Sequence, residues 1–247
     1  MDKDIHLSLR METIVSMVSK GNRVCDVGCD HGFVDIALVK RGISPTAVAM
    51  DVNEGPLKRA DEHIVEEMLG DRIRTVLSDG LNRYIIGEAD SLIIAGMGGP
   101  LMIRILSEEK EKTDSFAELI LSPQSQISDV RIFLYENGFV IDDENMVFED
   151  GKYYVVMHVV PGEGAINACE ASYGPVLIKK SEDIFRQYID KLIDKHNRLL
   201  CQLAEAPKTS ANEARKKELK EELKLLAEAM GGPAEETIRR YYGKTFN

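Results

Sequence analysis

The feature that most constrains this fold is the stretch VCDVGCDHGFVDIALV, which covers residues 24–39. An apolar run that predicts a strand leads into two glycines around Asp30-His31, and a run of helical period follows. A strand that passes through a glycine turn into a helix is typical of sheets that bind ligands at the carboxyl ends of their strands. The rest of the chain must supply the other strands and helices of such a sheet.

Alternation of strand and helix patterns continues over the first 160 residues. The apolar runs are continuous rather than alternating, which predicts a parallel sheet covered by helices on both faces. The last two strands join through Glu149-Asp150-Gly151, a hairpin signal. We therefore predict an α/β fold, a Rossmann-like doubly wound sheet with the outline of a class I methyltransferase. The predicted strands are 23–27, 46–52, 73–79, 89–99, 118–123 and a hairpin over 139–160, and the predicted helices are 7–19, 34–41, 55–69, 100–112 and 128–138.

Beyond residue 160 the pattern changes to heptads. The domain of residues 1–160 is followed by a connector at 161–177 and by a helical coiled-coil domain at 178–247. Apolar residues there recur at spacings of four and three, which predicts an antiparallel helical hairpin broken at Pro207, with a last helix after Pro233. The predicted seam consists of Phe185, Ile189, Leu192, His196, Leu199 and Leu203, then Leu219, Leu223, Leu226 and Met230.

Charge is distributed unevenly along the chain, whose net charge is −11. Residues 1–177 carry 16 Lys and Arg against 30 Asp and Glu, a net of −14, whereas residues 178–247 carry 15 against 12, a net of +3. The acidic average argues against a polyanionic partner, but the C-terminal part can present a basic face to one.

Neither a membrane nor a metal is indicated. No apolar run approaches the roughly 18 residues that span a bilayer, and the N-terminus lacks the pattern of a signal peptide, so we expect a cytoplasmic protein. The four cysteines have the spacing of neither a zinc site nor a disulfide framework.

Acidic residues stand at the ends of three successive predicted strands. Asp26 is near the end of the first, Asp51 follows 25 residues later, and Asp79-Gly80 ends the third. Carboxylates at this edge can accept hydrogen bonds from ribose hydroxyls and from the amino group of an adenine. Each acid alone could equally cap a helix or a turn. Together they favour a nucleoside ligand.

Asp30 distinguishes the glycine turn from a dinucleotide-binding turn. In the pattern G-x-G-x-x-G it replaces the middle glycine, where its carboxylate would repel a pyrophosphate. It would suit a ligand that carries an ammonium and a sulfonium, as S-adenosylmethionine does. The turn therefore favours a methyl donor over NAD.

The fourth predicted strand ends in AGMGGP, residues 95–100. Small residues there can form a flat floor for a planar base, or simply a tight entry into a helix at Pro100. The motif [N/D/S]-P-P-aromatic of amino-N6-adenine methyltransferases is absent from this position, which argues against methylation of an exocyclic amine.

These residues resemble the bacterial tRNA (adenine-22-N1)-methyltransferase family (TrmK). The resemblance runs nearly end to end and rests on DVGCDHGF (26–33), DVNEGPL (51–57), SDGL (78–81), IAGMGG (94–99) and LILSPQ (119–124), with LSLRM, EDGKYY and YGPVL as further matches. It implies transfer of a methyl group from S-adenosyl-L-methionine to N1 of adenine 22 in the tRNA D-loop. One difference is Ser122-Pro123-Gln124, where the family pattern is Gln-Pro-Asn.

The predicted site has three groups of residues and no metal. Asp30 is the candidate that stabilises the cationic product, and His31 orients it, contacts RNA or only packs at the helix turn. The donor is expected at Asp26, Gly28, Cys29, Asp51, Val52, Asp79, Gly80 and Gly96. The substrate is expected at Arg10, Met97, Gly98, Pro123 and Gln124.

The predicted partner is tRNA. The coiled coil is expected to form within one chain and to contact the tRNA through Lys216, Lys217, Lys220 and Lys224. An ordinary solvated helix face is the other interpretation of these lysines. Two alternative functions stay open: a methyltransferase for a small molecule or a protein, and a cofactor-binding scaffold that acts through its coiled coil.

Overall fold

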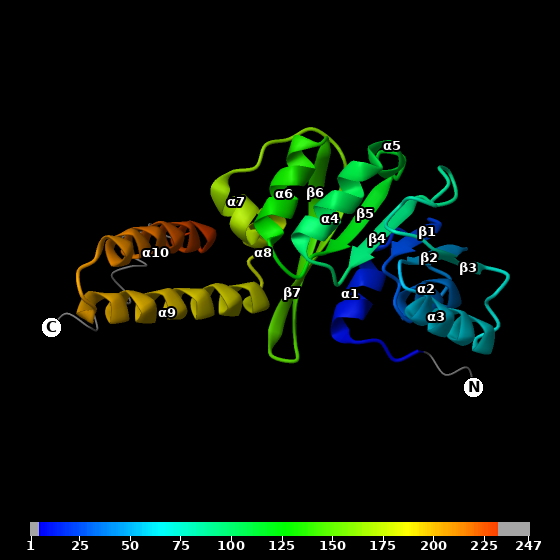
Figure 1. Cartoon of the computed structure of the whole chain (residues 1–247), viewed down its shortest axis with the longest axis horizontal. Coiled ribbons are helices and arrows are strands. Elements are labelled where there is room, and N and C mark those ends of the chain that lie inside the picture. Colours follow the sequence, from blue (N-terminus) through cyan, green and yellow to red (C-terminus); the bar gives the residue numbers. More distant parts are fainter. Residues whose placement is uncertain (1–4, 232–247) are drawn as a thin grey trace. The chain divides into compact units, whose positions relative to one another are not determined.

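The computed structural model describes residues 5–231 and divides the chain into two compact units, Met1–Ala165 and Ile166–Asn247 (Figure 1). The predicted helix after Pro233 lies outside the described residues.

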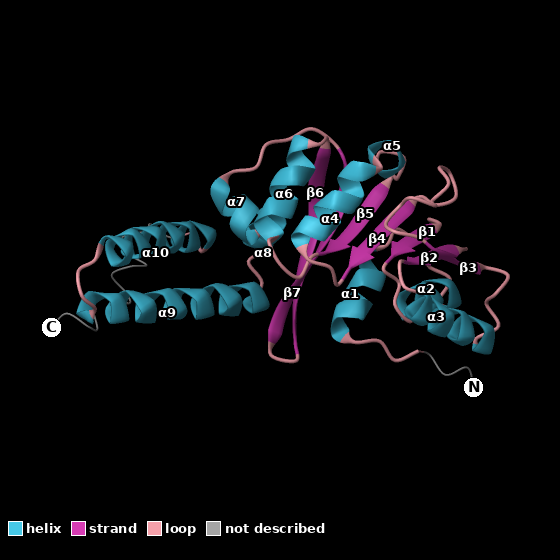
Figure 2. Ribbon diagram, in the orientation of Figure 1, coloured by secondary structure: helices cyan, strands magenta, loops and turns pink. Residues whose placement is uncertain are grey.

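The first unit is built on one seven-stranded sheet with the order β3-β2-β1-β4-β5-β7-β6 (Figure 2). The first five strands are parallel, and the final hairpin adds two antiparallel strands beside β5. This is the predicted doubly wound sheet of a class I methyltransferase. The strands are β1 (Val24–Val27), β2 (Ala47–Asp51), β3 (Ile73–Leu77), β4 (Ser91–Ala95), β5 (Glu118–Ser122), β6 (Phe139–Glu149) and β7 (Lys152–Pro161).

Helices cover the sheet on both sides. From β1 the chain moves to β2 and β3 in one direction and from β4 to β5 in the other. Because such crossovers are right-handed, the helices of the two halves lie on opposite faces. The helices are α1 (Leu9–Met17), α2 (Phe33–Lys40), α3 (Glu54–Glu66), α4 (Gly99–Glu108), α5 (Lys110–Thr113) and α6 (Ile127–Glu136).

Two details differ from the sequence-based boundaries. The predicted helix 100–112 is split at Glu109, whose φ of −116° and ψ of 53° leave the helical region. The fourth strand ends at Ala95, because Gly96 adopts a φ of +78° that turns the chain away from the sheet.

Strand register brings the carboxyl ends of the central strands to one edge. Val27 pairs with Met50 on β2 and with Ile94 on β4, while Ala95 pairs with Ser122 on β5. The turns that follow β1, β2, β4 and β5 therefore lie side by side. β1 and β4 meet where the strand order reverses, which is the position where open α/β sheets bind ligands.

The second unit is helical. It consists of α7 (Ala168–Tyr173), α8 (Pro175–Lys180), α9 (Asp183–Glu205) and α10 (Ser210–Ala229). The expected connector, 161–177, therefore includes α7 and the start of α8. α7 begins with a capping box, in which the Asn167 side chain accepts from the Glu170 N–H and the Glu170 carboxylate accepts from the Asn167 N–H.

The predicted hairpin forms between α9 and α10. On α10, Leu219, Leu223 and Leu226 are buried as predicted. On α9, Ile193 and Leu200 are buried more deeply than the predicted Leu192 and Leu199. α10 contacts both α7 and α9, so the apolar stripe that these helices bury is broader than a two-helix seam.

Among residues 5–231, no helix combines the length and the apolar character that a membrane crossing requires.

Candidate active site

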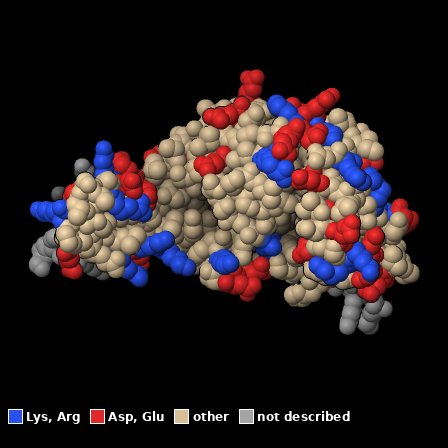
Figure 3. Space-filling view, viewed as in Figure 1, with Lys and Arg blue, Asp and Glu red and all other residues tan. Residues whose placement is uncertain are grey.

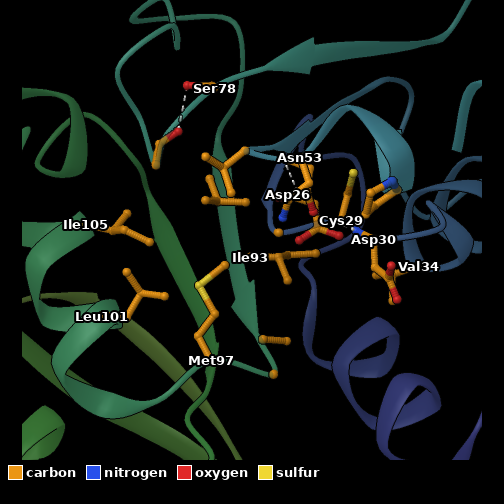
Figure 4. Close-up of a pocket in the computed structure, with 18 of the residues that line it drawn as sticks. Asp26, Cys29, Asp30, Val34, Asn53, Ser78, Ile93, Met97, Leu101 and Ile105 are labelled. Carbon is orange, nitrogen blue, oxygen red and sulfur yellow. Dashed lines mark hydrogen bonds between the residues drawn. The ribbon is translucent and has the colours of Figure 1, made fainter. Parts of the chain in front are cut away.

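A cleft of about 690 Å³ opens at the carboxyl ends of β1, β2 and β4. Its size is within the range of small-molecule sites, about 300–1,000 Å³. Figure 4 shows Asp26, Cys29, Asp30 and Asn53 on one side and Met97, Leu101 and Ile105 on the other. The lining includes these sequence-predicted residues: Arg10, Asp26, Gly28, Cys29, Asp30, Asp51, Val52, Asp79, Gly80, Gly96, Met97 and Gln124.

The glycine turn after β1 has few N–H groups to offer an anion. The N–H groups of Gly28 and Cys29 both donate to the Met50 carbonyl, at 2.7 and 3.0 Å, and that of Gly32 donates to the Cys29 carbonyl. The N–H of Asp30 points to the Asp51 carboxylate at 3.4 Å. The turn is therefore unsuited to a pyrophosphate, which agrees with the argument from the Asp30 carboxylate.

Gly28 is favoured by its backbone conformation. Its φ is +85°, which residues with a Cβ rarely adopt, and a Cβ there would also lie 2.3 Å from Cε of Met97, the flexible end of that side chain. The Met97 methyl group thus lies directly against the backbone of the turn, and any larger residue at position 28 would displace it.

A pair of buried carboxyl groups lies beneath the turn. Asp26 is 5% exposed and Asp35, on α2, is fully buried. Burial is the main cause that raises the pKa of Asp26 to about 7, with the Asp51 charge adding to it while a hydrogen bond with Asp35 lowers it. Burial and then the Asp26 charge raise the pKa of Asp35 well above its usual range. Among the described residues Asp35 has no cation as a partner, and burial therefore favours its neutral form.

Asp51 and Asp30 form the rim of the cleft beside this pair. Asp51 Oδ1 accepts from the Asn53 N–H at 2.8 Å, which leaves lone pairs on both oxygens for further donors. The Asp30 side chain is 65% exposed and its φ is +49°, a conformation that Asp tolerates better than most residues. Its carboxylate has no cation beside it other than the His31 ring, at 3.5 Å, among residues 5–231.

Asp79 is held by a residue that the sequence analysis missed. Arg104 on α4 donates to both Asp79 oxygens, at 2.8 and 3.3 Å, and this hydrogen bonding lowers the pKa of Asp79. Arg104, Leu101 and Ile105 line the cleft from one face of α4. Their spacing of three and four residues after AGMGGP is the signal that could have found them.

His31 does not line the cleft. Its ring stacks near Phe33 at 5.7 Å between centroids, and His63 lies 4.7 Å from Phe33. Arg59 donates to His31 Nδ1 at 3.3 Å. These contacts with α3 correspond to the packing alternative, although the ring still borders Asp30.

The substrate-side residues gather at the ends of β4 and β5. A Cβ at Gly96 would lie 3.7 Å from the Gln124 amide nitrogen and 3.8 Å from Nη1 of Arg10. Gln124 also donates its backbone N–H to the Met97 carbonyl at 2.8 Å, which joins the two turns. Pro123 is buried and Gly98 is part-buried, and neither lines the cleft.

The cleft fits S-adenosylmethionine by its chemistry. Asp26, Asp30 and Asp51 suit the ammonium, the sulfonium and the ribose hydroxyls, and the apolar surface of Val52, Leu101 and Ile105 suits an adenine ring.

Comparison with known proteins agrees with this geometry. A family model described as a methyltransferase domain matches residues 7–157. The tRNA (adenine(22)-N(1))-methyltransferase of Bacillus subtilis (strain 168) is 29% identical over 233 residues, which is 92% of this chain and 98% of that protein. The crystal structure of Streptococcus pneumoniae Sp1610 is 32% identical, with a TM-score of 0.84, over 91% of this chain and 100% of that one. The chain belongs to the TrmK family of tRNA (adenine-22-N1)-methyltransferases.

The structure of B. subtilis TrmK itself has a TM-score of 0.82 at 29% identity and covers 91% of this chain and 99% of that one. A second S. pneumoniae Sp1610 structure, 31% identical with a TM-score of 0.80, holds S-adenosyl-L-methionine. Coverage of more than nine tenths means that the TrmK likeness includes helices of the second unit as well as the sheet.

Proposed function

We propose that this chain transfers the methyl group of S-adenosyl-L-methionine to N1 of adenine 22 in tRNA. The observation that carries the proposal is the acidic cleft at the switch point of the sheet, within a chain that matches B. subtilis TrmK over 91% of its length. The cleft supports the donor, and the likeness supports the acceptor.

The donor is assigned to the carboxyl edge. Asp51 would accept from the ribose hydroxyls, Asp26 would face the cationic methionine part, and Val52 would cover the adenine ring. Asp79 would accept from the adenine amino group through the lone pairs that Arg104 leaves open. The donor would also contact the turns at the carboxyl edge, at Gly28, Cys29, Gly80 and Gly96.

The acceptor base is assigned to the turns after β4 and β5, where Arg10, Met97, Gly98, Pro123 and Gln124 gather. The Gln124 amide can both donate to and accept from the edge of an adenine. A base buried in folded tRNA must leave its stack to reach this position, at a cost of a few kcal/mol.

The reaction needs positioning more than proton transfer. When bound, S-adenosylmethionine supplies an electrophilic methyl group, and N1 of adenine carries a free lone pair at neutral pH. The protein therefore has no proton to remove before attack, and its main contribution is to hold the base in line with the methyl group.

Asp30 would stabilise the positive charge that develops on the base. It is exposed at the rim, and no Lys or Arg among the described residues pairs with it. Asp30→Asn should reduce turnover much more than donor affinity. Equal losses of both would make Asp30 a donor ligand only.

The helical tail would add contacts to tRNA. On α10, Lys216 and Lys224 pair with Glu213 and Glu221, both at 2.8 Å. Lys217 and Lys220 are exposed and form no salt bridge within the described part of the chain, although their charges act on Glu221 and Glu213. Figure 3 shows Lys and Arg side chains over this hairpin, interspersed with acidic ones. A tRNA substrate would also place the enzyme in the cytoplasm.

The test is incubation with labelled S-adenosylmethionine and total tRNA, followed by nucleoside analysis. Label in 1-methyladenosine is expected, and a transcript with adenine 22 replaced by guanine should accept none. No label in 1-methyladenosine would end the proposal, and label in protein or in a small molecule would identify the alternative methyltransferase.

A further inference from the structure

One cation of the cleft has no anionic partner. Two arginines line the cleft, and Arg104 is paired with Asp79 at 2.8 Å and with Glu108 at 3.1 Å. Arg10 is part-buried and makes no hydrogen bond or ion pair with any residue of the described range 5–231. In a cleft that is otherwise acidic, an unpaired guanidinium leaves its donors available to a ligand.

The Arg10 side chain is nevertheless held in place. Its guanidinium carbon lies 5.0 Å from the centroid of the Tyr154 ring on β7, within the range of a cation–π contact. Tyr154 thus supplies attraction for the positive charge without neutralising it.

The first turn of the helix that carries Arg10 is fixed by two contacts. The Leu9 N–H donates to the Glu149 carboxylate on β6 at 2.6 Å, and Glu12 pairs at 2.6 Å with Arg41, the residue that follows α2. Ile14 and Val15 bury their side chains in the core. Arg10 therefore projects from a rigid first turn, so little order must be gained when it binds.

The guanidinium is close to both predicted ligand positions. Nη1 of Arg10 and the Gln124 amide approach the same point above Gly96, at 3.8 and 3.7 Å from where a Cβ would be. Gly96 directly follows the end of β4, where the donor and the acceptor base must meet. Any anionic group that enters beside Gly96 comes within reach of Arg10.

We infer that Arg10 is the anion-binding group of the active site and that Tyr154 is its positioning residue. This rests on the proposed function, whose two substrates each carry one suitable anion: the α-carboxylate of the donor and a backbone phosphate next to the target adenine. Both offer oxygens that a guanidinium can bind through two parallel hydrogen bonds.

The experiment separates the two anions by direct binding. Affinity for S-adenosylhomocysteine, which keeps the carboxylate, is measured by calorimetry. Affinity for unmodified tRNA is measured by fluorescence anisotropy at several salt concentrations. The variants are Arg10→Gln, Tyr154→Phe and Tyr154→Leu, with Tyr153→Leu as the matched control because it is the next residue on β7 and its ring packs 4.7 Å from Phe148 instead.

Arg10→Gln should lower the affinity for one of the two ligands by about ten-fold, the usual scale for the loss of a hydrogen bond to a charged group. A loss for S-adenosylhomocysteine identifies the carboxylate. A loss for tRNA, with the salt slope reduced by about one, identifies a phosphate. Tyr154→Leu should lower the affinity for the same ligand by about three-fold. Tyr154→Phe keeps the ring face, and Tyr153→Leu keeps the contact between Arg10 and Tyr154. The affinity of both variants should therefore stay near that of wild type.

Unchanged affinity of Arg10→Gln for both ligands would overturn the inference. Equal losses in Tyr154→Phe and Tyr154→Leu would also overturn the role of Tyr154, because the ring face would then not matter. Failure of the proposed function has a different signature, since wild-type protein would then form no 1-methyladenosine whatever its affinity for S-adenosylhomocysteine.

Discussion

Apart from Asp79, which pairs with Arg104, the carboxylates at the two edges of the central sheet have opposite kinds of surroundings. At the amino edge, Glu118 begins β5 and accepts from His158 at 2.8 Å, from Ser19 and from Ser91. Just before β4, Asp90 accepts from Arg23 through two side-chain bonds of 2.7 and 2.9 Å. At the carboxyl edge Asp26 has another buried acid as its neighbour, and Asp30 has no Lys or Arg partner in the described chain.

The difference shows which edge of the sheet has carboxylates available to a ligand. The paired acids at the amino edge, Asp90 and Glu118, connect β4, β5 and β7 to the segment between α1 and β1, and they contribute to stability. Unpaired acids at the carboxyl edge are costly in the free protein, because burial raises the pKa of Asp26 and leaves Asp35 without a cation. A cationic ligand would remove that cost, so the carboxyl edge is adapted to binding rather than to stability.

The largest expected effect is on stability, and it tests whether the paired acids at the amino edge stabilise the fold. His158→Gln should lower the free energy of unfolding by about 3 kcal/mol, because it leaves the buried Glu118 charge without its cation. Denaturant unfolding measures this, and donor affinity of the folded protein should not change. The double variant His158→Gln, Glu118→Gln should recover part of the loss, and no loss in the single variant would contradict the role of the pair.

The same pair predicts how stability depends on pH. Hydrogen bonding to Glu118 raises the pKa of His158 from 6.5 to about 9, so its contribution is complete below 6.5 and is lost as pH rises through 9. Glu118 is buried, yet hydrogen bonds from His158 and Ser19 lower its pKa from 4.5 to about 2. Its contribution is complete above 4.5 and is lost as pH falls through 2. Melting curves of His158→Gln should lack the alkaline loss.

At the carboxyl edge the largest effect should be on binding. Asp51→Ala should weaken S-adenosylhomocysteine by about 100-fold, the loss of two hydrogen bonds to a charged group, with only a small change in stability. Calorimetry measures the affinity. Asp71→Ala is the control, since Asp71 is an exposed acid near the amino end of β3. A variant that binds as well as wild type would show that Asp51 only caps its own turn.

The buried pair should make donor binding depend on pH, with a smaller effect. Because the Asp26 pKa is about 7, ionisation between about pH 6 and pH 8 should strengthen S-adenosylmethionine binding by up to about ten-fold. The sulfonium carries an added positive charge, so S-adenosylhomocysteine should respond less. Asp26→Asn should remove the difference between the two ligands. Identical pH profiles for both ligands in wild type would contradict this role for Asp26.

Ionisation of Asp26 should strengthen donor binding but should lower the free energy of unfolding. Since the pKa of Asp26 is raised on folding, the free energy of unfolding should fall as pH rises from about 4 to about 7. Asp26→Asn should be the more stable protein above that range even though it binds the donor less well.

The smallest effect concerns the tail. Lys217→Ala with Lys220→Ala should weaken tRNA binding by about three-fold in low salt, and the loss should become smaller as the salt concentration rises. Lys216→Ala with Lys224→Ala is the control, because those lysines already pair with glutamates. Equal losses in both double variants would point to net charge rather than to particular contacts.

Much of the fold could be predicted from local patterns. Continuous apolar runs with intervening helical periods predict the parallel sheet and its carboxyl edge but not the strand order, and Asp26, Asp51 and Asp79 were found by their place near strand ends. Tyr154 could not be found this way, because it reaches the site from β7, far along the chain from the glycine turns. Arg104 follows AGMGGP closely, and the helical spacing of that run is the local signal for it. His31 stands beside Asp30 in sequence, and its ring packs toward α3, which is one of the roles that the sequence left open.

The sequence by itself determined the sheet, the glycine turn and the kinds of charge at the carboxyl edge, because hydrophobic period and glycine placement act over a few residues. Only the tertiary structure decided which charges are neutralised. Pairing depends on distance in space. Packing places Arg104 beside Asp79 and His158 beside Glu118, while Arg10 lies over the Tyr154 ring with no anion paired to it among residues 5–231.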